Sequence, residues 1–136
     1  MKLFIAKENI LSGTSYSEIY PKALNLYKSI AKRSKRRPYI RSLYFEKSKV
    51  FLDYFWEHLR GKNFGDRVRR LKFYSCALDL IRYSSVAPEC KINPIKKSEI
   101  LYRFGGQTRE KIQFIVQIKE NKNGQKHFLS VFPGNS

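Results

Sequence analysis

The stretch that decides the fold is KIQFIVQIKENKNGQKHFLSVF, residues 111–132. In its first half Phe114, Val116 and Ile118 alternate with more polar residues, which is the two-residue period of a strand with one buried face. The dipeptide Asn123-Gly124 follows, and it is a strong signal for the tight turn of a β-hairpin. The stretch therefore predicts a hairpin with strands at 111–120 and 126–132.

The chain on either side of this turn predicts the rest of the sheet. In the returning strand we expect Leu129 and Val131 to face away from the side that carries Phe128, Ser130 and Phe132. A further strand is predicted at residues 99–104, and residues 87–97, with two prolines, are expected to form a loop. One face of this antiparallel sheet would be apolar, and the open face would carry Arg103, Gln117, Lys119 and Ser130.

Before Ser98 the apolar residues recur at intervals of three and four, which is the period of helices. We expect helices at 16–31 and 46–59, and a third that is capped by Asp66 and fades near Ser84. The predicted fold class is α+β: about three N-terminal helices packed on one face of a C-terminal antiparallel sheet of three to four strands. We expect one domain, 1–136, with a helical part at 16–84 and a sheet part at 98–133.

The composition points to a polyanionic partner. Twenty-eight Lys and Arg stand against eleven Asp and Glu among 136 residues, a net charge of +17, and a folded protein usually tolerates such self-repulsion in order to bind nucleic acid. Neither a secretory leader nor a membrane-spanning segment is visible, so the expected location is the cytoplasm, without membrane contact. Cys76 and Cys90 lack the spacing of a zinc site, and we expect reduced thiols, no metal and no cofactor.

The charge is concentrated in residues 21–70, with fifteen Lys and Arg against four acidic residues. Cations near the C-terminal end of a helix interact favourably with the helix dipole, but that effect explains only two or three of these basic residues. We predict a nucleic-acid-binding tract and, on the first turns of the third helix where cations are unfavourable, a second basic group. The tract consists of Arg33, Lys35, Arg36, Arg37, Tyr39 and Arg41, and the second group of Arg67, Arg69, Arg70 and Lys72.

Tyr39, Tyr44, Tyr74 and Tyr102 lie close to basic residues. Each tyrosine either packs in the core or stacks on a nucleic-acid base. The sequence lacks a phosphate-binding glycine loop and a carboxylate cluster for two metal ions, which leaves metal-free chemistry. RNA supplies its own nucleophile, the 2′-hydroxyl, so cleavage needs only proton transfer and cations for the phosphorane charge.

Arg103, Lys119 and Ser130 are the candidate catalytic set on the open face, the alternative being a solvated cross-strand polar patch. The cations would hold the phosphate and Ser130 would hydrogen-bond the reacting group. The chain has two histidines, His58 and His127, so any histidine acid or base is one of these, unless both are structural or surface residues.

The run ILYRFGGQTREKIQFIVQIKENKNGQKHFLSVFP, residues 100–133, preceded by basic helices, resembles the metal-independent ribonuclease superfamily of barnase, EndoU, the tRNA-cleaving colicins and RelE, in its phage and mobile-element branch. The segments RRPYIRSLYFEKSKVFLDYFWEHL and GDRVRRLKFYSCALDLIR also resemble a group of bacterial proteins with this layout. The resemblance implies a toxin-type ribonuclease that is held by an antitoxin. It also implies roles for Arg103, Lys119 and Ser130 on the strands, with His58, Arg70 or Tyr74 as helix-borne partners.

Three functions therefore remain open. The first is a metal-independent endoribonuclease of toxin type that cleaves RNA by attack of the 2′-hydroxyl, on transfer RNA or a ribosome-associated RNA, with an acidic antitoxin as a further partner. The second is a non-catalytic module that binds RNA or DNA, with RNA preferred. The third is an adaptor that docks an acidic protein through the same basic face.

Overall fold

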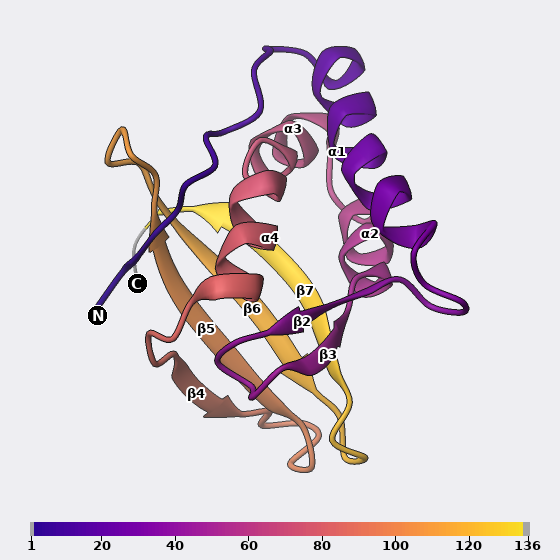
Figure 1. Ribbon diagram of the computed structural model, residues 1–136, viewed down its shortest axis with the longest axis vertical. Helices are drawn as coiled ribbons and strands as arrows, with labels where there is room; N and C mark the ends of the chain where they lie inside the picture. Colours follow the sequence, from indigo (N-terminus) through magenta and orange to yellow (C-terminus); the bar gives the residue numbers. More distant parts are fainter. Residues whose placement is uncertain (1, 135–136) are drawn as a thin grey trace.

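The computed structural model describes residues 2–134 and shows helices packed over a long, curled sheet (Figure 1). Within those residues the chain forms four helices and seven strands, in this order: β1 Phe4–Ile5, α1 Tyr16–Ala31, β2 Tyr39–Ser42, β3 Ser48–Phe51, α2 Asp53–Arg60, α3 Phe64–Leu71, α4 Tyr74–Tyr83, β4 Glu89–Ile92, β5 Ile100–Gln107, β6 Gln113–Glu120 and β7 Lys126–Pro133. No helix between residues 2 and 134 combines the length and the apolar character that crossing a membrane requires.

The sheet is mixed, and its strand order is β1-β5-β6-β7-β3-β2, with β4 pairing with β5 outside this path. β5, β6 and β7 form antiparallel pairs, whereas β1 runs parallel to β5 and β3 runs parallel to β7. The predicted fold of three N-terminal helices on a three- to four-stranded antiparallel sheet is therefore wrong. The physical reason is that short strands from the first half of the chain extend both edges of the predicted hairpins.

The C-terminal hairpins are where the sequence pattern and the structure agree. The strands predicted at 99–104, 111–120 and 126–132 are present as β5, β6 and β7, and Gly124 adopts a positive φ of 84° in the turn between the last two. Phe114, Val116 and Ile118 are fully buried in the core that the helices cover.

The predicted alternation of β7 fails at a bulge. The register shifts between Gln117 and Ile118, so Ser130 pairs with Gln117 while Phe128 pairs with Ile118. An extra residue in one strand reverses the alternation beyond it, and Phe128 and Val131 therefore both enter the core.

The helices differ from the prediction in two places. The helix predicted at 46–59 is a strand followed by a helix, because Glu46 and Lys47 adopt positive φ angles in a turn that leads into β3. The third predicted helix is two helices, α3 and α4, separated at Lys72 and Phe73, and α3 is capped by Asn63 rather than by Asp66. The helix predicted at 16–31 is confirmed as α1. The predicted loop at 87–97 contains β4.

Candidate nucleic-acid interface

The basic tract spans the connection between α1 and β2 and continues into β2, on the side of the molecule where β2 and β3 meet α2 (Figure 1). It lines an open hollow of ≈ 710 Å³, which we call the basic hollow. Its lining residues come from the tract, from β2 and β3, and from the turn before β7: Arg33, Lys35, Arg36, Arg37, Tyr39, Lys49, Phe51 and Gln125. Five of the six predicted tract residues, all except Arg41, therefore line one surface depression.

The cations of the basic hollow divide into free and engaged side chains. Arg33, Lys35 and Arg36 are exposed, and none of the five ion pairs among residues 2–134 involves them. Arg37 instead pairs with Asp53, at 2.8 Å between Nη2 and Oδ1, and its guanidinium lies 4.5 Å from the centre of the Phe51 ring. Arg37 is therefore held in place, whereas Arg33, Lys35 and Arg36 are available for phosphates.

Tyr39 lies at the edge of the same hollow, between two cations. The Nζ atom of Lys49 lies 4.7 Å from the centre of its ring and the guanidinium carbon of Arg41 lies 5.6 Å from it. The β2–β3 register explains this, because Tyr39 pairs with Phe51 and Arg41 pairs with Lys49. Arg41 also donates to the carbonyl oxygen of Lys47 at 2.9 Å, so one nitrogen of its guanidinium group is already hydrogen-bonded.

His127 is fully buried beneath Tyr54 at the centre of this region. The two rings are stacked, with centroids 4.0 Å apart and planes 8° apart. Nδ1 lies 3.5 Å from Nη2 of Arg37, and Nε2 lies 3.0 Å from the side-chain nitrogen of Asn121. Burial lowers the pKa of His127, and the charge of Arg37 lowers it further. The imidazole is therefore neutral near pH 7, and its position under Tyr54 makes it a support for the site rather than a group that touches a ligand.

A second hollow is lined by Tyr54, whose ring centre lies 5.7 Å from the guanidinium carbon of Arg37. Its volume is ≈ 740 Å³, and we call it the Lys119 hollow; it is lined by Tyr54, Lys96, Ser98, Glu99, Lys119, Asn121, Lys122 and Asn123. Lys119 Nζ lies 3.5 Å from Oε2 of Glu99 and 5.3 Å from the centre of the Tyr54 ring. A buried carboxylate, an ammonium group and an aromatic ring thus share one depression next to the basic hollow.

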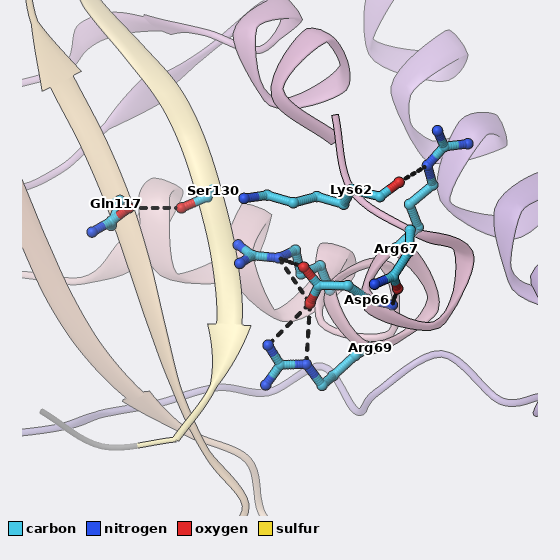
Figure 2. Close-up of polar contacts among 8 residues, drawn as sticks. Lys62, Asp66, Arg67, Arg69, Gln117 and Ser130 are labelled. Atoms are coloured by element: carbon cyan, nitrogen blue, oxygen red, sulfur yellow. Dashed lines mark hydrogen bonds and ion pairs between the residues drawn. The ribbon is translucent and has the colours of Figure 1, made fainter. Parts of the chain in front are cut away.

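The three predicted catalytic residues Arg103, Lys119 and Ser130 do not line one common hollow. Arg103, Gln117 and Ser130 are partners in one cross-strand row, and Figure 2 shows Ser130 on β7 bonded to Gln117 on β6. The distance between Ser130 Oγ and the Gln117 amide is 2.8 Å. With the amide oxygen turned toward Arg103, that oxygen accepts from Nε at 2.8 Å and from Nη2 at 3.1 Å. Ser130 is only 2% exposed, so its hydroxyl cannot reach a substrate without opening the sheet. Lys119 belongs to the neighbouring hollow.

The three helix-borne candidates, Tyr74, His58 and Arg70, are not part of either hollow. Tyr74 is fully buried among aromatic rings, with the ring centres of Phe55 and Trp56 each at 5.2 Å. Burial raises the pKa of its hydroxyl, and the side chain belongs to the core. His58 is exposed in the last turn of α2. Burial of its ring and the charges of Lys62 and Arg70 lower the pKa of His58, but neither hollow includes it.

The second basic group is mostly engaged within α3. Arg69 and Arg70 both bond to Asp66, and Arg67 donates to the carbonyl oxygens of Lys62 and Arg60, as Figure 2 shows for several of these contacts. Because α3 begins at Phe64 rather than at Asp66, Arg69 and Arg70 lie in its last turn, where cations favour the dipole. The argument that these cations are placed against local preference is therefore wrong. Lys72 is half-buried beyond the end of α3.

Sequence reasoning missed residues that line one of the hollows or pair with a lining residue: Lys49, Asp53, Tyr54, Glu99 and Asn121. One signal could have placed two residues of β3. Lys49 and Phe51 share the two-residue period of Tyr39 and Arg41, so a pair of strands there would have put all four on one sheet face.

Comparisons of this chain with protein-family models, with curated proteins and with solved structures gave no match. The ribonuclease resemblance therefore stays a prediction, and the geometry above carries the functional argument.

Proposed function

We propose that this chain is an RNA-binding protein whose basic hollow holds the backbone of a single strand. The observation that carries the proposal is that Arg33, Lys35 and Arg36 are exposed and free of ion pairs around a hollow walled by Tyr39 and Phe51. Free cations supply phosphate contacts, and aromatic rings supply stacking surfaces that unpaired bases favour. RNA remains the preferred partner because its single-stranded loops expose such bases. The cytoplasm is the compartment that this partner implies.

Binding should be measured by fluorescence anisotropy of labelled single-stranded RNA, matched single-stranded DNA and duplex RNA over a salt series. We expect the single strand of RNA to bind most tightly, with an affinity that falls steeply as salt rises. Transfer RNA and ribosomal RNA would then be compared as larger targets. If none of these ligands binds at about 0.15 M salt while an acidic protein does, the adaptor function replaces this proposal.

A second candidate function is metal-independent cleavage of the bound RNA in the Lys119 hollow. It is favoured by the contact between Lys119 and the buried carboxylate of Glu99, beside Tyr54 and next to the proposed path of the strand. Glu99 can accept the proton of the 2′-hydroxyl as its oxygen bonds to the phosphorus, while Lys119 compensates the charge of the phosphorane. The P–O5′ bond then breaks, and the ammonium group of Lys119 donates the proton that the leaving 5′-oxygen takes up. The cleavage would leave a 2′,3′-cyclic phosphate and a 5′-hydroxyl. A toxin of this type would be neutralised by an acidic antitoxin over the basic hollow.

Incubation with total RNA in excess chelator, followed by analysis of the fragment ends, tests this second candidate. We expect cyclic phosphate ends that disappear with Glu99→Gln and with Lys119→Ala but persist with Ser130→Ala and Arg103→Ala. Loss of cleavage with Arg103→Ala alone would instead restore the predicted open-face site. Intact RNA with a salt-dependent anisotropy change would leave the chain as a binding module.

A further inference from the structure

A third depression lies between α1 and α2, and four of the ten residues that line it are aromatic. Its volume is ≈ 380 Å³, and we call it the aromatic cleft. The residues that carry the argument are Tyr16, Tyr20, Tyr27, Asp53, Trp56 and Glu57. In Figure 1 these two helices lie side by side at one edge of the molecule, next to the connection that carries the basic tract.

The aromatic rings of the cleft form walls at different angles. Tyr16 and Tyr20 are stacked, with ring centres 5.0 Å apart and planes 28° apart. Trp56 stands almost perpendicular to Tyr20, at 88° and 6.0 Å, and lies 5.4 Å from Tyr27. All four rings are only partly buried. A flat ligand ring can therefore lie against one wall while its edge meets another, which are the two favourable geometries for aromatic pairs.

Two of the chain's eleven acidic residues, Asp53 and Glu57, line this cleft. Arg60 and Arg67 line it as well, and Arg67 donates to the carbonyl oxygens of Lys62 and Arg60. Asp53 is paired with Arg37, whereas none of the ion pairs among residues 2–134 involves Glu57. Carboxylate oxygens only accept hydrogen bonds when ionised, and they pair with the exocyclic amino groups of nucleobases. The acids thus complement an amino-bearing edge beside the aromatic walls.

One ion pair connects the lining of the cleft with the lining of the basic hollow. Asp53 lines the cleft, Arg37 lines the basic hollow, and their side chains bond at 2.8 Å and 3.1 Å. A strand whose phosphates occupy the basic hollow can therefore turn a base across this pair into the cleft. We propose that the aromatic cleft binds one unpaired, amino-bearing nucleobase of the RNA strand, an inference that rests on the proposed RNA binding.

The chain offers a direct probe, because Trp56 is its only tryptophan. Titration with cytidine monophosphate and uridine monophosphate should quench the fluorescence of Trp56, with cytidine the stronger ligand. For a single-stranded oligocytidine we expect tighter binding than for a strand of equal length with abasic sites, by about tenfold. Glu57→Gln should reduce the preference for cytidine over uridine, and this exposed position should tolerate the change in the fold. Tyr20→Leu should remove most of the gain over the abasic strand, while Tyr83→Leu, an exposed tyrosine outside the cleft, is the matched control.

The outcomes separate this inference from the proposed function. If the abasic strand binds as tightly as the oligocytidine with unchanged Trp56 fluorescence, the inference is overturned while RNA binding stands. If no strand binds but cytidine monophosphate quenches Trp56 in a manner sensitive to Glu57→Gln, the cleft binds bases and the proposed strand path fails. Quenching by tetramethylammonium and not by either nucleotide would make the cleft a cation site and overturn the inference.

Discussion

Replacing Arg33, Lys35 and Arg36 together by glutamine should weaken the binding of single-stranded RNA in a salt-dependent way. These three side chains are exposed and unpaired in the basic hollow, so we expect each to neutralise one phosphate. For single strands each phosphate contact contributes about 0.7 to the slope of log K against log salt, so the slope should become shallower by about 2. The same relation gives a loss of about a hundredfold in affinity at about 0.1 M salt, falling to about tenfold at about 0.3 M.

The assay is fluorescence anisotropy with a labelled RNA of about 12 nucleotides at a series of salt concentrations. The matched control replaces Lys2, Lys7 and Arg109 by glutamine. This variant loses the same charge from exposed positions near β1 and in the turn between β5 and β6, on the opposite side of the view from the α1–β2 connection (Figure 1). We expect only a small effect there, because exposed charges beyond about 10 Å are largely screened at about 0.1 M salt. Equal losses for both variants would refute the reasoning, since binding would then follow net charge and not the basic hollow.

The remaining predictions concern the sheet and the buried histidine. Ser130→Ala removes a buried hydroxyl that bonds Gln117, so urea denaturation should show a loss of about 1 kcal/mol, with RNA binding unchanged. Gly106→Ala places a methyl group against the ring of Phe114, its cross-strand partner, and we expect a loss of about 1–3 kcal/mol in the same measurement. Burial holds the pKa of His127 below the 6.5 of a free histidine. The unfolded chain therefore binds the proton more readily, so unfolding free energy should fall as pH drops below 6.5, and His127→Gln should make that fall shallower. A pH profile of the variant identical to that of the parent chain would contradict this assignment.

The sequence alone predicted an element correctly where the periodicity of that element's own residues matches the face that it buries. Residues 16–31 are a helix in both prediction and structure, because Ile19, Ala23 and Ile30 lie on one face and are buried there. The β6–β7 hairpin was likewise readable, since its turn contains a glycine at a positive φ between two alternating strands. In both cases the local period and the buried face agree.

The sequence was not sufficient where the same residues suit two structures. Val50, Phe51, Tyr54 and Phe55 fit the spacing of one amphipathic helix, and equally fit a strand followed by a helix. What decides is pairing with distant residues: β3 lies between β2 and β7, and Phe51 is the partner of His127. Periodicity within a window contains no information about such partners. β4 was missed for a different reason, because all of its residues are exposed and it carries no apolar alternation.

The sequence predicted that the candidate site is basic, but not which of its basic side chains are free in the folded protein. The tract at 33–37 was identified from its composition, and the structure leaves three of its cations free. The cations of α3 looked similar in the sequence, yet Asp66 and backbone carbonyls engage Arg67, Arg69 and Arg70. Which cations are free depends on where acceptors lie in space. Similarly, Ser130 was expected on an open face, but a bulge and a neighbouring amide bury its hydroxyl.

The pair of Arg37 and Asp53 is the feature that joins these observations. The side chains of Arg37 and Asp53 are 38% and 30% exposed. Their ion pair should therefore contribute only about 0–1 kcal/mol to the free energy of unfolding, and this small contribution does not explain why the pair lies where it does. Its place in the structure is more informative, because Arg37 lines the basic hollow, Asp53 lines the aromatic cleft, and the adjacent Tyr54 lines the Lys119 hollow. Asp53 lies in the first turn of α2, where an acid favours the dipole, and its two bonds fix the guanidinium over Phe51. A cation that is fixed before binding loses less side-chain entropy on contact with a phosphate. In the proposed RNA complex, the start of α2 is the point at which one strand meets all three depressions.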